Sequence, residues 1–84
     1  MVAVHFYSRP GCHLCDAAEA VLMAVRAEIE FQWIKVDIDA DPLARSLYHE
    51  EIPVTLLSSG KKFRYGLDAD EFRRQLLRSG AHRL

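Results

Sequence analysis

Cysteine, proline and glycine are scarce in this chain of 84 residues, which contains two, three and four of them, respectively. Two cysteines are too few for a secreted scaffold held by several disulfides, and so little proline and glycine excludes a collagen-like or low-complexity chain. Neither sign of charge dominates, because 11 basic and 12 acidic side chains give a net charge of −1. Long apolar runs are also absent. The longest uncharged one, residues 20–25, is far shorter than the roughly 20 residues that span a bilayer.

Half of the residues are hydrophobic and 27% are charged, a balance typical of folded globular chains. We expect one domain over residues 1–84, since this length supports a single hydrophobic core. The N-terminus has no basic segment before its first apolar stretch, which predicts a cytoplasmic protein without a secretory signal. We also expect a monomer that does not bind membranes. Binding to nucleic acids is not expected either, because no aromatic residues interleave with the basic side chains of the last quarter for base stacking.

Apolar periodicity predicts an α/β fold with the element order β-α-β-α-β-β-α. Strands are expected at residues 2–7, 31–37, 54–58 and 62–65, and helices at residues 12–27, 42–49 and 68–80. The first two strands and the helix between them form a right-handed parallel unit, and the last two strands form an antiparallel hairpin. A four-stranded mixed sheet with three helices on both faces would bury the apolar stripes of all these elements.

Local signals mark the ends of the second and third helices. Asp41 before Pro42 is a favourable N-cap, because proline tolerates the first helical position, where its missing N–H is not needed. In this second helix we expect Leu43 and Leu47 to be buried. The third helix begins with an acidic N-cap at Asp68, and Gly80 is its expected C-cap.

The two cysteines, Cys12 and Cys15, lie between the first strand and the first helix with C-x-x-C spacing. A helix N-terminus carries unpaired N–H groups and a partial positive charge, which stabilise a thiolate placed there. Cys12 at the exposed end would attack a disulfide, and Cys15, one turn further on, would resolve the mixed disulfide. His13 is either a cationic partner of the Cys12 thiolate or a residue that points to solvent.

Two other functions fit the same residues. A binding module without catalysis would pair with a partner strand along Ile52 and Pro53. A metal-handling protein would hold a soft ion with Cys12, Cys15 and His13. A closed structural zinc site is disfavoured, because it needs four ligands and the chain has no second C-x-x-C.

Residues 6–15, Phe-Tyr-Ser-Arg-Pro-Gly-Cys-His-Leu-Cys, resemble the active-site segment of the glutaredoxins. Residues 52–55, Ile-Pro-Val-Thr, resemble the segment that carries a cis-proline in the thioredoxin superfamily. Residues 11–16, Gly-Cys-His-Leu-Cys-Asp, are similar to the active-site segment of a family of small glutaredoxin-like proteins. The resemblance implies a thioredoxin fold and a thiol–disulfide oxidoreductase.

The resemblance also implies roles for individual residues. Cys12 would be the nucleophile and Cys15 the resolving cysteine. Residues expected to bind a substrate or glutathione are Arg9, His13, Leu14, Ile52, Pro53, Gly66 and Asp68. No metal or organic cofactor is implied, and glutathione would enter as a co-substrate. The expected partners are a protein disulfide or a glutathione mixed disulfide, together with a thiol reductant such as glutathione or a thioredoxin-reductase system.

Three residues depart from the glutaredoxin pattern. Leu14 stands where a tyrosine usually borders the glutathione pocket, Tyr65 replaces the first glycine of a Gly-Gly pair, and Glu51 replaces a threonine. Glu51 would place an acid beside a site meant for an anion. These departures predict weak glutathione binding and a preference for a protein or another thiol.

Overall fold

The computed structural model describes residues 1–84. The elements follow one another as β1 (Ala3–Ser8), α1 (His13–Arg26), β2 (Ile29–Glu30), β3 (Gln32–Asp37), η1 (Ile38–Ala40), α2 (Pro42–Tyr48), β4 (Val54–Leu57), β5 (Lys62–Arg64), α3 (Ala69–Arg78) and β6 (His82–Arg83). Apart from β2, β6 and the short 3₁₀ turn η1, this is the predicted β-α-β-α-β-β-α order. The α/β fold class is therefore confirmed.

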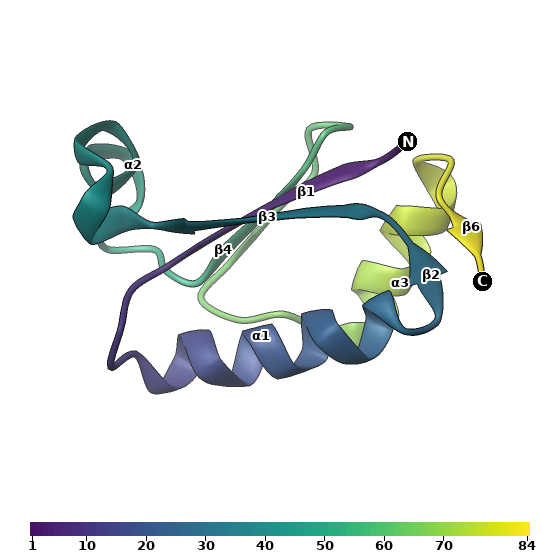
Figure 1. Cartoon of the computed structure of the whole chain (residues 1–84), viewed down its shortest axis with the longest axis horizontal. Helices are drawn as coiled ribbons and strands as arrows, with labels where there is room; N and C mark the ends of the chain where they lie inside the picture. Colours follow the sequence, from purple (N-terminus) through teal and green to yellow (C-terminus); the bar gives the residue numbers. More distant parts are fainter.

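The four-stranded sheet has the order β3-β1-β4-β5 and is mixed. Strand β1 runs parallel to β3 and antiparallel to β4, and β4 and β5 form the antiparallel hairpin. The register places Tyr7 of β1 opposite Val36 and Val54. Because α1 connects two parallel neighbours, it crosses back along the sheet, and its N-terminus lies at the end where β1 finishes (Figure 1).

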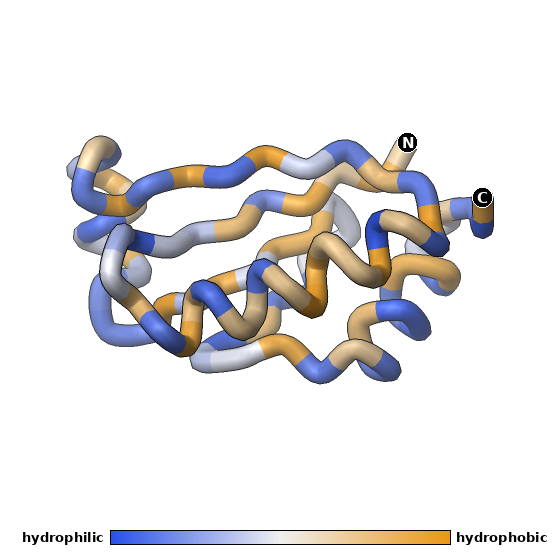
Figure 2. The backbone as a smooth tube through the Cα atoms, turned by 60° about the horizontal axis from the view of Figure 1, so that its bottom comes forward, coloured by the Kyte–Doolittle hydropathy of each residue, from blue (hydrophilic) through white to orange (hydrophobic).

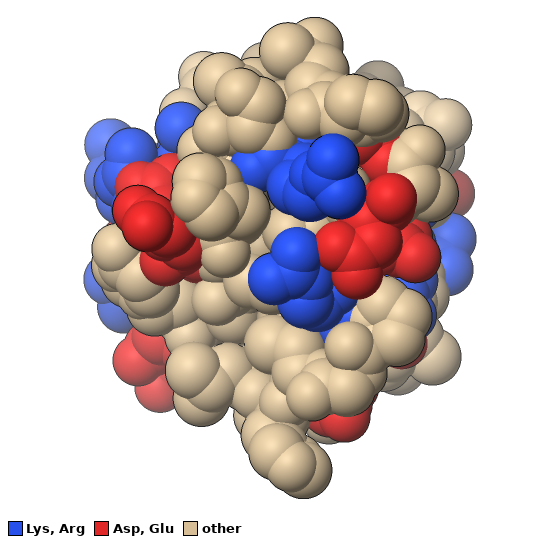
Figure 3. Space-filling model, turned by 90° about the vertical axis from the view of Figure 1, so that its left-hand side faces the viewer, with Lys and Arg blue, Asp and Glu red and all other residues tan.

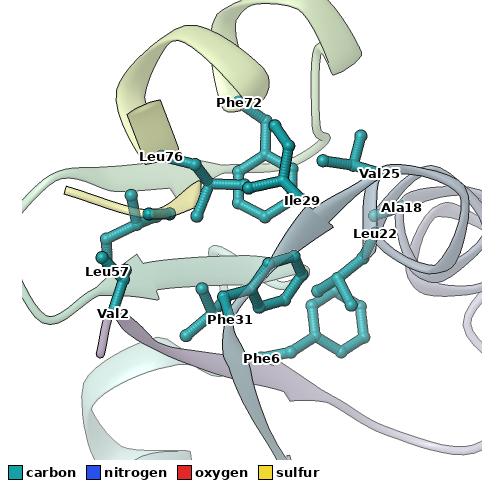
Figure 4. Close-up of a cluster of buried hydrophobic side chains, with 12 residues drawn as sticks. Val2, Phe6, Ala18, Leu22, Val25, Ile29, Phe31, Leu57, Phe72 and Leu76 are labelled. Carbon is teal, nitrogen blue, oxygen red and sulfur yellow. The ribbon is translucent and has the colours of Figure 1, made fainter. Parts of the chain in front are cut away.

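Alternation along β1 divides the sheet into two faces with different cover. Val4 and Phe6 are fully buried against α1 and α3, whose apolar side chains complete the main core. The ring of Phe72 in α3 meets Phe31 and Phe63 edge-on, with centroids 5.7 and 6.0 Å apart. Figure 4 shows the side chains of this core converging from the sheet and both helices.

Helix α1 is amphipathic, and hydrophobic and hydrophilic residues alternate along it in Figure 2. Its buried residues are Cys15, Ala18, Leu22 and Val25. The three-, four- and three-residue spacings keep them on one face, which packs on the sheet. No helix in the structure is both long enough and apolar enough to cross a membrane.

The predicted N-caps are confirmed, whereas the C-cap of α3 is Ser79, one residue before the expected Gly80. The Asp41 carboxylate accepts a hydrogen bond from the Ala44 N–H at 3.1 Å, and the Asp68 carboxylate accepts one from the Glu71 N–H at 2.9 Å. Gly80 follows the end of α3 with φ +98°, a left-handed conformation that glycine adopts without steric cost.

The prediction for the buried face of α2 is wrong. Leu43 and Leu47 are 70% and 57% exposed. The helix instead buries Ala44 and packs Tyr48 on Tyr7, with the ring centroids 4.6 Å apart. A helix of seven residues covers the second sheet face with one narrow stripe, and here that stripe is the Ala44–Tyr48 side.

Two further boundaries differ from expectation. Strand β5 ends at Arg64, because Tyr65 takes a left-handed backbone conformation with φ 67° that leaves the strand. The small two-stranded sheet of β2 and β6, which pairs Ile29 with Arg83, was not predicted.

Candidate redox site

The two cysteines form a disulfide at the start of α1, and their Cα atoms are 5.1 Å apart. Strand β1 ends at Ser8, and the chain turns at Gly11 with φ +77° before reaching Cys12. Cys12 is the N-cap of α1, and its Sγ accepts a hydrogen bond from the Cys15 N–H at 3.1 Å. One sulfur therefore lies directly at the unpaired N–H groups of the helix, where a negative charge is stabilised.

The two sulfur-bearing residues differ in accessibility. Cys15 is only 2% exposed, whereas Cys12 is half-buried. His13 and Leu14, between them, both lie on the surface, and Leu14 is 61% exposed. An incoming disulfide can therefore approach Cys12 more readily than Cys15.

The Ile52–Pro53 segment lies at the same end of the sheet. Since Val54 pairs with Tyr7, the residues just before β4 are next to those that follow β1. The Ile52–Pro53 peptide bond is cis, as the resemblance implied. Neither the N–H nor the C=O of Ile52 takes part in a hydrogen bond within the chain. A guest strand could use both groups, which is how sheet edges bind extended peptides.

Arg9, expected to bind a substrate or glutathione, is already paired with a carboxylate of the chain. Its Nη2 and Nε donate to the same Asp39 oxygen at 2.8 and 3.3 Å. The hydrogen bond from Arg9 is the main reason that the pKa of Asp39 is lowered, and the same bond raises the pKa of Arg9. The carboxylate of Asp39 in η1 thus already binds the Arg9 guanidinium in the loop before Cys12.

Glu51 has a comparable partner on the other side of the site. Its carboxylate forms an ion pair with Arg64, whose Nε is 2.9 Å from a Glu51 oxygen, and its carbonyl accepts a hydrogen bond from the Tyr65 N–H at 3.0 Å. The acid that Glu51 was expected to place beside the site is thus paired with a basic side chain of the same hairpin. Tyr65 is 57% exposed and has the positive φ that a glycine would adopt easily.

Gly66 and Asp68, two of the residues expected to bind a substrate or glutathione, lie just before α3. Gly66 is exposed, and a Cβ built on it would meet nothing within 4 Å. The Asp68 carboxylate is the N-cap acceptor of α3. The Asp68 carboxylate therefore already accepts a hydrogen bond from the Glu71 N–H, and a ligand donor here would share that carboxylate with the helix N-terminus.

Two hollows open at this end of the molecule. The first, of about 310 Å³, reaches the buried Cys15 and is lined by Ser8, Arg9, Pro10, Cys15, Asp16, Glu19, Lys35 and Asp37. Within it, Lys35 Nζ lies 2.7 Å from a Glu19 oxygen. The second, of about 390 Å³, is lined by Arg9, Pro42, Arg45, Ser46 and His49.

The surface around the site alternates in charge. Figure 3 views this end of the molecule and shows basic side chains with acidic ones directly beside them. No group of three or more His, Cys, Asp or Glu side chains is placed to hold a metal ion. Sequence reasoning missed the roles of Asp39 and Arg64, because each is defined by a partner that lies elsewhere in the chain, 30 residues away for Asp39.

Comparison with known proteins gives a consistent family. Residues 3–77 match the model of the glutaredoxin-like domain (DUF836). A structural-genomics target protein from X. campestris, solved by X-ray crystallography, has 31% identity and a TM-score of 0.74, with 89% of this chain and 96% of that one covered. No curated protein matches the chain significantly.

Two further structures have the same fold. A protein from Nitrosomonas europaea, solved by NMR, has 28% identity and a TM-score of 0.72, with 88% of this chain and 89% of that chain covered. A malarial protein has 17% identity and a TM-score of 0.75, with 94% and 96% covered. At this low identity the malarial protein supports the fold alone.

Proposed function

The chain belongs to the glutaredoxin-like domain family, and on that premise we propose that it is a thiol–disulfide oxidoreductase with Cys12 as nucleophile and Cys15 as resolving thiol. The observation that carries the proposal is the asymmetry of the pair. Cys12 is the accessible N-cap of α1, whereas Cys15 is buried one turn further on. The helix N-terminus stabilises the thiolate of the residue that a substrate can reach.

The reaction has two exchange steps. The Cys12 thiolate attacks one sulfur of a substrate disulfide, the substrate S–S bond breaks, and the leaving sulfur takes the electron pair and a proton. Cys15 then loses its proton and attacks the Cys12 sulfur, which releases the second substrate thiol. Two electrons pass from the protein dithiol to the substrate, and the protein is left with the Cys12–Cys15 disulfide. A thiol reductant, either glutathione or a reductase-coupled dithiol, must then restore the reduced form.

The partner and location follow from the same proposal. Ile52, with its unpaired backbone groups, supports an extended peptide as substrate. No cofactor enters the scheme, and glutathione takes part only as a thiol. We place the reaction in the cytoplasm, where thiols are kept reduced. The free Ile52 edge equally supports the second candidate function, a binding module without catalysis.

Single-cysteine variants test the proposal. Cys12→Ser should lose disulfide reduction down to the uncatalysed background, because no accessible thiolate remains. Cys15→Ser should still attack and should accumulate a mixed disulfide that mass spectrometry detects. In the reduced wild type, iodoacetamide should alkylate Cys12 faster than Cys15 near pH 7.

The outcomes separate the two functions. A binding module would give two slowly alkylated thiols and no exchange with any disulfide. Equal alkylation of both thiols, or activity retained in Cys12→Ser, would contradict the assignment of the nucleophile. Supplying the oxidised protein with glutathione alone, and separately with a thioredoxin-reductase system alone, identifies the electron donor.

A further inference from the structure

We propose that Asp39 and Glu51 are specificity-determining residues that discriminate against anionic disulfides, so that the preferred substrate carries neutral or cationic groups beside its disulfide. The inference rests on the proposed function and specifies the substrate class of the same site. It starts from the observation that the two arginines flanking the cysteines are each paired with a carboxylate of the chain itself.

The first pair lies beside the cysteine loop. Arg9 is three residues before Cys12, and both of its contacting nitrogens donate to one Asp39 oxygen. Asp37 adds a second negative charge close enough to contribute to the raised pKa of Arg9, and Arg45 contributes to the lowered pKa of Asp39. Asp39 therefore pairs with Arg9 and interacts at longer range with Arg45, and its charge compensates the basic side chains that would otherwise attract an anionic substrate.

The second pair lies beside the peptide-pairing segment. Glu51 immediately precedes Ile52, and its carboxylate is held by Arg64, which pairs with Val54 across the hairpin. The neighbouring Lys62 has its ammonium group 5.2 Å from the Tyr48 ring centroid, over the ring face. The basic residues on this side are thus also engaged within the chain.

Such pairing changes what a charged ligand gains. A carboxylate that binds an unpaired arginine gains a charge-assisted hydrogen bond. At this site a ligand carboxylate must either displace Asp39 or Glu51 from its arginine or lie beside it. Repulsion between the two negative charges then disfavours the anionic ligand. Around Cys12 itself, Leu14 is 61% exposed, and the exposed Asp16, one turn further along α1, adds another negative charge. The surface therefore fits an uncharged or apolar segment better than the acidic ends of glutathione.

The test compares three small disulfides of different charge. Protein reduced with dithiothreitol and freed of it is mixed with an excess of glutathione disulfide (anionic), hydroxyethyl disulfide (neutral) or cystamine (cationic). Each turnover converts one protein dithiol and one disulfide into the Cys12–Cys15 disulfide and two small thiols. The measured quantity is the ratio of second-order rate constants, which cancels differences in intrinsic thiol reactivity and in folded fraction.

For the wild type, glutathione disulfide should react most slowly relative to its uncatalysed exchange. Asp39→Asn and Glu51→Gln should each raise the ratio of glutathione disulfide to hydroxyethyl disulfide by about fivefold, the effect of one exposed charge at short range. The same variants should lower the ratio for cystamine. Added salt should reduce all of these differences, because exposed charges are screened.

Glu28→Gln is the matched control. It removes a carboxylate from a similar ion pair, with Arg73, that lies beyond the far end of α1 from Cys12. Its rate ratios should equal those of the wild type. Ratios unchanged within twofold in both Asp39→Asn and Glu51→Gln would overturn the inference while leaving the proposed function intact. Failure of the wild type to react with any of the three disulfides would instead overturn the proposed function.

Discussion

Where α1 ends, the carboxylate of Glu28 is held by Arg73 of α3 through two separate contacts of 3.2 and 2.8 Å. Where α1 begins, the two contacts of Arg9 share a single oxygen of Asp39. The first pair joins two elements around the main core. The second joins the loop before Cys12 to η1. The same kind of ion pair therefore joins packed parts of the chain at one end and, in the role we propose for Asp39, sets the charge near Cys12 at the other.

The largest difference in stability is expected between two leucine-to-alanine substitutions, one at a buried position and one at an exposed position. Leu22 is fully buried in the core, and Leu22→Ala should lower the free energy of unfolding by about 2–5 kcal/mol. Leu43 is 70% exposed, and Leu43→Ala should change it by no more than about 0.5 kcal/mol. Urea unfolding of the oxidised proteins measures both. Similar losses in the two variants would show that α2 is packed at its leucine face.

A smaller effect is expected at Tyr65. Its positive φ is disfavoured for every residue with a Cβ, so Tyr65→Gly should be more stable than Tyr65→Ala by about 1 kcal/mol. At Gly66, whose backbone lies outside the left-handed region and has open space around it, Gly66→Ala should leave stability unchanged or raise it by up to about 1 kcal/mol. Glycine is therefore expected to be more stable than alanine at position 65 but not at position 66, and chemical denaturation of the variants measures this difference. A more stable Tyr65→Ala would contradict the left-handed conformation.

The smallest effects on stability are expected when acid protonates the carboxylates of the Glu28–Arg73 and Asp39–Arg9 ion pairs. Hydrogen bonding to arginine lowers the pKa of Glu28 and of Asp39 in the folded state. Their contributions to stability are therefore present above the unfolded pKa and are lost as the pH falls through the folded pKa. Glu28→Gln and Asp39→Asn should be less stable than the wild type at pH 7, and the difference should shrink below about pH 4. Thermal unfolding at pH 7 and pH 3 measures it.

The comparison between the two pairs makes that experiment sharper. Glu28→Gln should cost more stability than Asp39→Asn, because Glu28 uses both of its oxygens. Only Asp39→Asn should alter the choice between charged disulfides. A variant whose stability difference from the wild type stayed constant from pH 7 to pH 3 would mean that the lost carboxylate was not ion-paired.

Features set by neighbours in sequence were predictable. The caps at Asp41 and Asp68 depend on N–H groups three residues away, and the cysteine pair depends on a strand ending just before a helix. Hydrophobic periodicity located α1, because its apolar face is covered along the whole helix. The burial of Leu43 and Leu47 was predicted wrongly, because periodicity identifies an apolar face without showing whether anything packs on it.

Features set by distant partners were not predictable. Strands β2 and β6 are two residues each, and they exist only because the C-terminus returns to Ile29. The charge of Glu51 could be read from the sequence, but its neutralisation by Arg64 depends on the register of the β4–β5 hairpin. The structure brings the cysteine loop and the Ile52–Pro53 segment to one end of the sheet, whereas the ion pairs around them were not foreseen.

The Cys12 Sγ that caps α1 is also the atom that would react, so formation of the helix and ionisation of the Cys12 thiol are thermodynamically linked. The free energy by which the N-terminus of α1 stabilises the Cys12 thiolate equals the free energy by which the thiolate stabilises the helix, because linkage is reciprocal. In a mixed disulfide the same sulfur is neutral and its acceptor strength falls. The Cys15 N–H would then lose part of its partner while Cys15 is called on to attack. Loosening of the first helical turn would therefore coincide with the step that requires the buried sulfur to move.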